Sequence, residues 1–366
     1  MTEAKATMVG ERALLAQVIV GRQSREESAD SLAELERLAD TAGMRVAGSL
    51  TQRRDRPDPG TFMGQGKLAE LQLACRTAQA NRIVFDNTLS SVQANNLALA
   101  TGIPVMDRTE LILQIFARRA RSAEAQMQVE LAQLEHQASR VQVAERQQRF
   151  HGGIGARGPG ESPFALHKAP LLHRIRMLKR KLQEVRKRRE RTRERRPWPV
   201  ACLVGYTNAG KSTLLNALAG ADAYADDRLF ATLDTKSRAF RLPGGRTVLL
   251  TDTVGFIRNL PHSLVASFRS TLEEITEADL LLLVADAAHP QLEPQVRVVL
   301  ETLADLGTDR KPRLLLLNKA DRPEAAARLE SLRTIFPEAL AVSATERTGL
   351  DAVADRIERM LAADRN

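Results

Sequence analysis

The chain has 366 residues, of which 43% are hydrophobic, so two or three domains with buried cores are expected. Its apolar runs are too short for a membrane-spanning helix, and its N-terminus does not match a signal peptide. The net charge is +9, and the segment from His173 to Arg196 alone contains 10 Arg, 3 Lys and 3 Glu, so the rest of the chain is close to neutral.

The first hundred residues alternate between strand and helix patterns. Strands are expected over residues 14–21, 44–50 and 81–86, and helices over 28–42, 67–79 and 91–100. This alternation predicts parallel βαβ units, and therefore a small α/β domain over residues 1–106. Within it, the stretch Gly64-Gln65-Gly66-Lys67 is interpreted as a helix start. A weak nucleotide site is the alternative, although the spacing of a full phosphate-binding loop is missing.

Residues 107–196 are expected to form a long antiparallel helical hairpin. Asp107 and Glu110 make a capping box, and neither Gly nor Pro follows until Gly152. Apolar or small residues recur every three or four positions, which predicts one continuous helix of about 42 residues and roughly 60 Å. The glycine-rich stretch 151–162 would then form the tip of the hairpin.

The second helix of the hairpin carries an apolar stripe and most of the positive charge. Its expected inward residues are Leu171, Ile175, Leu178, Leu182 and Val185, and Pro163 and Pro170 are expected to delay its start. The basic segment predicts contact with a nucleic acid backbone; a solvated helix face is the alternative. If nucleic acid is bound, charge reversal at Arg186, Arg188 and Arg189 should weaken binding.

The stretch Ala201–Leu218 is predicted to be an apolar strand, a glycine-rich turn and a helix. The turn matches the Gly-x4-Gly-Lys-Ser pattern of phosphate-binding loops, whose backbone N–H groups bind phosphates. In that pattern Lys211 reaches the β- and γ-phosphates and the Ser212 hydroxyl binds Mg²⁺. The expected nucleotide contacts here are Gly205, Tyr206, Thr207, Asn208, Ala209, Gly210, Lys211, Ser212 and Thr213.

Two later segments are expected to face the phosphates. Asp252 would hold Mg²⁺ through water, and the Gly255 amide would sense the γ-phosphate. In residues 229–238, Phe230 is expected to contact the nucleotide and Thr232 to close over Mg²⁺ and the γ-phosphate. Thr235 is the alternative to Thr232, because spacing alone does not separate them. The expected catalytic residues are Lys211, Thr232 and Gly255, and the expected metal ligands are Ser212, Thr232 and Asp252.

Asn318-Lys319-x-Asp321 follows a buried strand and predicts selectivity for guanine. A carboxylate at Asp321 accepts hydrogen bonds from N1 and the 2-amino group of guanine, a donor pair that adenine lacks. Asn318 would help to fix the base edge, and the Lys319 stem would pack on the ring. Ser343 and Ala344 follow another strand and suit a backbone contact to the base. A GTPase domain with a mostly parallel sheet is therefore expected over residues 199–366.

Phe256 stands where many small GTPases carry a Gln that orients the attacking water. A phenyl ring cannot hydrogen-bond to water, so hydrolysis is expected to be slow alone or to be assisted. Asn208 offers one route. In GTPases with a hydrophobic residue at this position, an Asn in the phosphate loop can help to hold K⁺. The alternative is that Asn208 only stabilises the loop.

These ordered motifs, preceded by GGIGARGPGE and by a helix opening with DRTELILQIFARRA, resemble the HflX family of GTPases over about residues 10–366. The resemblance implies binding of GTP and GDP with Mg²⁺, and contact with the large ribosomal subunit and its RNA through the basic helix and hairpin tip. It also implies GTP-dependent splitting or rescue of stalled ribosomes. A ribosome-assembly or RNA-binding GTPase without splitting activity is the alternative. The sequence after Glu161 departs from the family pattern at the tip.

The two cysteines, Cys75 and Cys202, lie in apolar surroundings and are expected to be buried thiols in a reducing cytosol. A cytoplasmic location is therefore expected, with peripheral attachment to a membrane left open. The protein is also expected to be a monomer.

Overall fold

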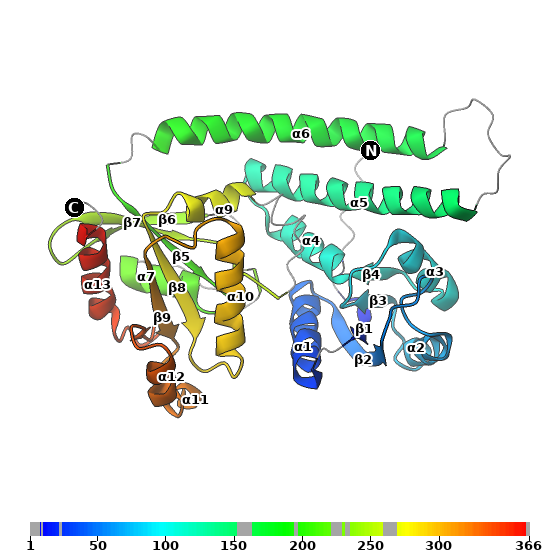
Figure 1. Cartoon of the computed structure of the whole chain (residues 1–366), viewed down its shortest axis with the longest axis horizontal. Helices are drawn as coiled ribbons and strands as arrows, with labels where there is room; N and C mark the ends of the chain where they lie inside the picture. The colour runs from blue at the N-terminus through cyan, green and yellow to red at the C-terminus, as the bar shows by residue number, and fades with distance from the viewer. Residues whose placement is uncertain are drawn as a thin grey trace. The chain divides into compact units, whose positions relative to one another are not determined.

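The computed structural model describes residues 8, 10–21, 24–151, 163–193, 197–220, 229–230, 235–258 and 269–363 (Figure 1). The chain divides into two compact units. Unit 1 comprises Met1–Arg118 and Met127–Leu182, and unit 2 comprises Arg119–Gln126 and Gln183–Asn366.

Unit 1 contains a four-stranded parallel sheet in the order β2-β1-β3-β4. Its strands alternate with helices along the chain, so the predicted α/β organisation is confirmed. The elements are β1 (Arg12–Val20), α1 (Arg25–Thr41), β2 (Arg45–Arg54), α2 (Gln65–Thr77), β3 (Arg82–Phe85), α3 (Ser91–Thr101) and β4 (Val105–Asp107).

Local capping and alternating apolar residues explain this sheet. Ser24 and Glu27 form a reciprocal capping box at the start of α1, and Ser90 and Gln93 form another at α3. Gly64 is the N-cap of α2, which confirms a helix start at the glycine-rich stretch there. Inward residues of β1 pack against α2 and α3 in one core that includes Leu14, Ala16, Val18, Leu71, Cys75 and Leu97.

The prediction of one continuous helix from Asp107 is wrong, because α4 (Arg108–Arg119) and α5 (Ala123–His151) are separate. Ser122 explains the break: its Oγ accepts a hydrogen bond from the Ala125 backbone N–H at 3.1 Å. A serine hydroxyl that caps a new helix competes with continuation of the old one. At the start of α4, Asp107 Oδ1 accepts from the Glu110 N–H at 2.9 Å, as half of the predicted capping box requires.

α6 (Pro163–Arg193) runs antiparallel to α5, as predicted for the hairpin (Figure 1). The two helices pack through Leu131, Ala138, Ile175 and Leu178. The expected delay of the second helix is wrong, since α6 begins at Pro163 and continues through Pro170. Proline fits a first helical position without loss, and Pro170 is exposed, so water can satisfy the carbonyl that its missing N–H leaves. The predicted tip lies outside the described residues.

Unit 2 contains a six-stranded sheet in the order β10-β9-β8-β5-β7-β6, parallel except for β6. A turn closed by Leu242 and Arg246 joins β6 to β7. The elements are β5 (Val200–Gly205), α7 (Lys211–Ala219), β6 (Lys236–Arg241), β7 (Thr247–Asp252), α9 (Arg269–Thr276), β8 (Leu280–Asp286), α10 (Leu292–Asp305), β9 (Arg313–Asn318), α11 (Pro323–Ala326), α12 (Leu329–Ile335), β10 (Leu340–Ala341) and α13 (Leu350–Ala363).

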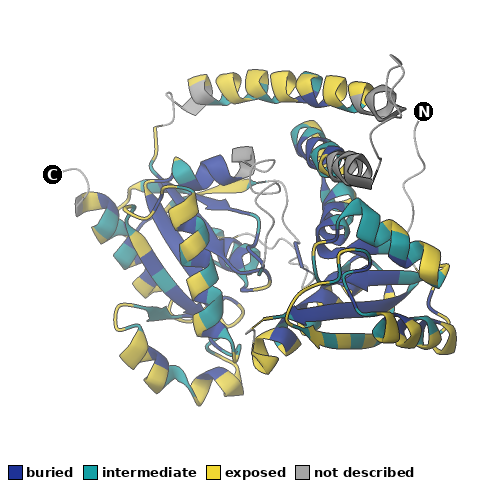
Figure 2. Ribbon diagram, turned by 45° about the vertical axis from the view of Figure 1, so that its right-hand side comes forward, coloured by how far each residue is buried: buried dark blue, intermediate teal, exposed yellow. Residues whose placement is uncertain are grey.

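Helices cover both faces of the unit 2 sheet. α7 and α13 pack on one face through Leu215 and Ile357, and α9 and α10 pack on the other through Ile275 and Leu303. The central strands β5 and β8 are buried along their whole length (Figure 2). The carboxyl ends of β5, β7, β8 and β9 meet at one edge, where open α/β sheets bind ligands. No helix in the described part of the chain is long and apolar enough to span a bilayer.

Candidate functional site

The loop Gly205–Gly210 leaves β5 at this edge and leads directly into α7. Asn208 and Gly210 have positive φ angles of 61° and 90°. A Cβ at Gly210 would lie 2.2 Å from Asn318 Nδ2, so only glycine fits there. The first turn of α7 directs its N–H groups and its dipole toward the loop, an arrangement that binds anions. The loop is therefore shaped to hold a phosphate chain.

Lys211 begins α7 and lies under the loop with only 7% of its surface exposed. Its Nζ donates to the carbonyls of Gly205 at 3.1 Å and Tyr206 at 2.9 Å. Burial lowers the pKa of Lys211 from 10.5 to about 8, although the charge of Asp252 opposes that effect. A buried ammonium of this kind gains most from a bound polyanion.

This lowered pKa predicts a pH-dependent nucleotide affinity. The protonated form binds phosphates, so affinity should fall as the pH rises through the Lys211 pKa. Between pH 7 and 8.5 the protonated fraction falls about fourfold, and the Kd for GDP should rise by about the same factor. Titration of a fluorescent GDP across this range measures the effect. Lys211→Arg, whose guanidinium stays charged, should give a flat profile; the same slope in both proteins would contradict this role of Lys211.

Ser212 and Asp252 bring a hydroxyl and a carboxylate together from two different elements. Ser212 Oγ donates to Asp252 Oδ2 at 2.6 Å, and Asp252 is fully buried at the end of β7. Hard oxygen ligands of this kind are those that Mg²⁺ prefers beside a phosphate chain. The donor set therefore fits the metal expected from the sequence.

The segment Gly255–Phe256 is fastened to the phosphate loop by its backbone. Thr207 N–H donates to the Phe256 carbonyl at 2.8 Å, and Phe256 N–H donates to the Gly205 carbonyl at 3.1 Å. A Cβ on Gly255 would lie 2.8 Å from Thr207 Cα and 3.0 Å from Lys211 Nζ. Gly255 thus lies against the loop at the place where a terminal phosphate is expected.

The Phe256 side chain belongs to the hydrophobic core. It is 2% exposed and packs in one cluster with Cys202, Ile275 and Leu283. The sequence predicts only that this residue cannot orient a water molecule. The structure adds that its ring is packed in the hydrophobic core between the sheet and helices α9 and α10.

Asn318 connects the phosphate loop to the last strand of the site. It is 1% exposed; its Nδ2 donates to the Ala209 carbonyl at 2.9 Å, and its Oδ1 accepts from the Ala344 N–H at 3.1 Å. Ser343 is fully buried beside it and accepts from the Glu346 N–H at 3.0 Å. Asn318 therefore fixes the loops that surround the expected base position.

Asp286 is a residue of this site that the sequence analysis missed. Lys319 Nζ donates to Asp286 Oδ2 and to the Asn208 carbonyl, both at 2.7 Å. One feature of the sequence could have identified Asp286. It is the acidic residue at the end of the apolar stretch Leu280–Asp286, and this strand pairs with the one that carries the Asn318 motif. Asp321 lies just beyond Lys319 and is exposed, as a carboxylate that contacts a ligand must be.

The remaining predicted contacts are only partly described. Thr232 lies outside the described residues, and Thr235 is half-buried before β6, so the choice between them stays a prediction. Phe230 is 2% exposed with a φ of 56°. Thr213 is half-buried in the first turn of α7, and the Tyr206 hydroxyl accepts from the Arg258 N–H at 2.7 Å.

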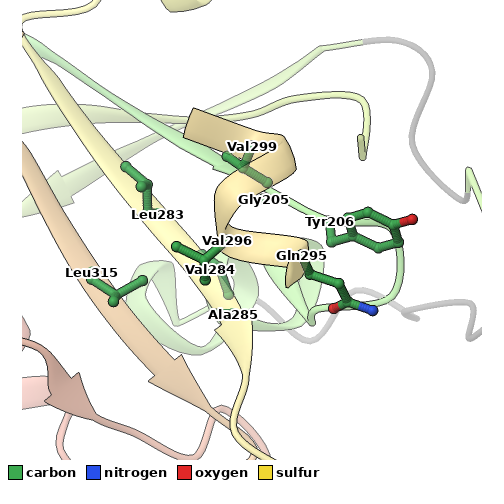
Figure 3. A pocket seen from close by; sticks show the side chains of 9 residues that line it. All are labelled: Gly205, Tyr206, Leu283, Val284, Ala285, Gln295, Val296, Val299 and Leu315. Atoms are coloured by element: carbon green, nitrogen blue, oxygen red, sulfur yellow. The ribbon is translucent and has the colours of Figure 1, made fainter. Parts of the chain in front are cut away.

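A small apolar cavity lies beside the phosphate loop, between β8 and α10. Figure 3 shows the Tyr206 and Gln295 side chains at one side of it, with aliphatic side chains forming the rest. Such a lining does not suit a phosphate, although Gly205 and Tyr206 of the phosphate loop also line the cavity. The aliphatic residues are Leu283, Val284, Ala285, Val296, Val299 and Leu315.

A phosphate-binding loop between strand and helix, a Ser–Asp pair for Mg²⁺ and an Asn-Lys-x-Asp motif on the same sheet edge define a P-loop GTPase. Family models match the chain in three parts. They are described as GTP-binding GTPase N-terminal (residues 29–117), GTP-binding GTPase Middle Region (119–196) and 50S ribosome-binding GTPase (200–319). The chain belongs to the HflX family of GTPases, as predicted, and its activity is hydrolysis of GTP.

The relatives support this assignment over nearly the whole chain. GTPase HflX of Caldanaerobacter subterraneus subsp. tengcongensis is 46% identical over 355 residues, which cover 96% of this chain and 81% of that protein. GTPase HflX of Escherichia coli (strain K12) is 42% identical over 319 residues, covering 86% and 74%. A solved structure described as SsGBP in complex with GDP is 26% identical with a TM-score of 0.50, covering 96% of this chain and 98% of that one.

Proposed function

We propose that this GTPase binds the large ribosomal subunit and uses GTP to split or rescue stalled ribosomes. One matching family is described as 50S ribosome-binding. The observation that carries the proposal is the series of basic residues on α6, a helix that is exposed over most of its described length (Figure 2). A basic helix face is suited to the phosphates of ribosomal RNA.

The basic residues of α6 differ in exposure and in their partners. Arg180, Lys187 and Arg191 are exposed and spaced by seven and four residues, which places them on one face of the helix, here called the α6 stripe. Arg186 and Arg189 instead form ion pairs with carboxylates of unit 2. Charge reversal at Arg186 and Arg189, suggested by the sequence, would break these pairs as well as any RNA contact. The α6 stripe is the cleaner target.

Charge reversal of all three α6 stripe residues to Glu should weaken ribosome association strongly and flatten its salt dependence. Each bound phosphate that a variant can no longer neutralise lowers the slope of log K against log salt by roughly 0.7–0.9, so three of them should lower it by about 2. Co-sedimentation with ribosomes at several salt concentrations measures both quantities. Reversal of the exposed Arg310, Arg333 and Arg359, an equal charge change elsewhere, is the matched control. Equal effects of the two triple variants would rule out the α6 stripe as the RNA contact.

The same preparation separates splitting from the alternative of an assembly GTPase. Intact ribosomes incubated with the protein and a non-hydrolysable GTP analogue should release free subunits on a gradient, and the α6 stripe variant should release fewer. Binding without any rise in free subunits would favour the assembly or RNA-binding alternative.

The proposed cofactors are Mg²⁺ at Ser212 and Asp252, with Thr232, and K⁺ beside Asn208. Asn208 is exposed, and its carbonyl already accepts from Lys319, so the side-chain oxygen is the group we assign to K⁺. Hydrolysis compared in potassium and sodium buffers, for wild type and Asn208→Ala, separates this role from loop stabilisation. The protein is proposed to act as a cytoplasmic monomer, with peripheral membrane attachment still open.

A further inference from the structure

Helix α9 carries two adjacent carboxylates whose side chains are nearly buried. Glu273 and Glu274 expose 8% and 6% of their side chains. A buried carboxylate is costly unless a cation or several hydrogen bonds compensate it. The compensating cations come from the C-terminal part of α6, far from α9 in the sequence.

Arg186 and Arg189 supply these cations. Arg186 Nε lies 3.1 Å from Glu273 Oε1, and Arg189 lies 4.0 Å from Glu274 Oε1. Arg189 also pairs at 2.8 Å with Glu124, which belongs to the same unit. These contacts are here called the α6–α9 ion pairs.

Arg186 and Arg189 follow the apolar stripe of α6 in the direction of its C-terminus. They continue, at helical spacing, the inward stripe of Ile175, Leu178 and Leu182, although their side chains stay 46% and 34% exposed. The inward face of α6 thus changes from apolar residues to charges along its length. Charged side chains at the C-terminal end of α6 need partners of opposite charge at fixed positions. Apolar side chains would allow the helix to shift along its neighbours.

The opposite side of α9 packs in the hydrophobic core of unit 2. Leu272 and Ile275 are 4% and 0% exposed and pack in the cluster that contains Phe256. The Phe256 backbone is in turn bonded to Thr207 and Gly205 of the phosphate loop.

Cys202 on β5 is fully buried. Burial raises the pKa of this thiol well above its usual value, and the charges of Glu274 and Asp252 raise it further. The α9 carboxylate and the carboxylate of the nucleotide site therefore lie close to one buried strand.

We propose that Arg186 and Arg189 are positioning residues for GTP hydrolysis, acting through α9. By pairing with Glu273 and Glu274 they fix α9, and α9 fixes Phe256 and the Gly255 amide against the phosphate loop. Because such coupling is reciprocal, nucleotide at the loop and the position of the α6 end bias each other. The proposal extends the GTPase activity and does not depend on which partner α6 contacts.

Hydrogen exchange of the purified full-length protein tests the coupling without ribosomes. In the wild type, amides of residues 183–189 should exchange at different rates with GDP and with a non-hydrolysable GTP analogue. Glu273→Gln with Glu274→Gln should reduce that difference at least threefold and lower kcat several-fold. The Kd for GDP should change less than twofold, because neither glutamate reaches the nucleotide.

Two further variants keep the test decisive if the buried glutamate substitutions fail to fold. Arg186→Gln with Arg189→Gln breaks the same ion pairs from the more exposed side, and Arg186→Lys with Arg189→Lys should largely restore the wild-type behaviour. Arg310→Gln with Arg333→Gln, two exposed arginines of unit 2 away from α6, is the matched control and should change neither quantity. The proposal is overturned if the wild type shows no nucleotide-dependent difference at residues 183–189. It is equally overturned if the Arg186/Arg189 glutamine variant keeps that difference.

Discussion

Asp321→Asn is expected to weaken GDP binding by about 100-fold or more, because it removes a charge-assisted acceptor for two guanine donors, each worth about 1.5–3 kcal/mol. Asp321 is exposed at the end of the Asn318 motif, so the fold should tolerate the change. The new amide can donate to the carbonyl that xanthine carries in place of the guanine amino group. Affinity for xanthosine diphosphate should therefore rise while that for GDP falls.

Titration of fluorescent GDP, XDP and ADP against the wild type and the variant measures this change of base preference. Asp355→Asn, another exposed aspartate, on α13, is the control and should bind all three nucleotides as the wild type does. Unchanged GDP affinity in the Asp321 variant would refute the guanine contact.

Gly255→Ala is expected to lower the rate of GTP hydrolysis by about 100-fold, the scale for losing one aligned donor to a transition-state charge. The added Cβ would lie 2.8 Å from Thr207 Cα, a backbone atom that cannot move without the phosphate loop. The Gly255 amide is then pushed from the position expected for the γ-phosphate. GDP lacks that phosphate, so its affinity should fall far less than the rate.

Single-turnover hydrolysis and GDP titration separate these two effects. Gly66→Ala is a matched substitution, since a Cβ there meets nothing within 4 Å. A Gly255→Ala protein that hydrolyses GTP at the wild-type rate would show that this segment does not contact the terminal phosphate.

The sequence predicts those parts of the site that depend on local chain geometry. The phosphate loop, the Asp252–Gly255 stretch and the Asn318 motif each lie within a few consecutive residues, at the ends of apolar strands that periodicity identifies. Their meeting at one sheet edge follows from parallel strand order. The α/β class of unit 1 and the hairpin of α5 and α6 follow from periodicity in the same way.

The features that the sequence does not predict are the break between α4 and α5 and the ion pairs between distant residues. The first depends on a single helix cap, and the second depend on tertiary packing. A serine cap at Ser122 divides the long helix, whereas the apolar spacing shows only one stutter there, at Ala123, Met127 and Leu131, which a continuous helix also accommodates. The partner of Lys319 is an aspartate on another strand, and the partners of Arg186 and Arg189 lie on α9. Neither pairing has a sequence spacing that would reveal it, because tertiary packing alone brings these groups together.

The burial of Phe256 affects what determines the lifetime of the GTP-bound state. In a GTPase that orients its own attacking water, the intrinsic rate of hydrolysis sets the lifetime of the GTP-bound state. Here the side chain at that position is part of the core, so it cannot be turned toward the phosphates without opening the packing of β5, β8 and α9. We infer that the duration of the GTP-bound state is set by an encounter with another molecule. GTP binding would then put the protein in its active state, and contact with that molecule would trigger hydrolysis and end the cycle.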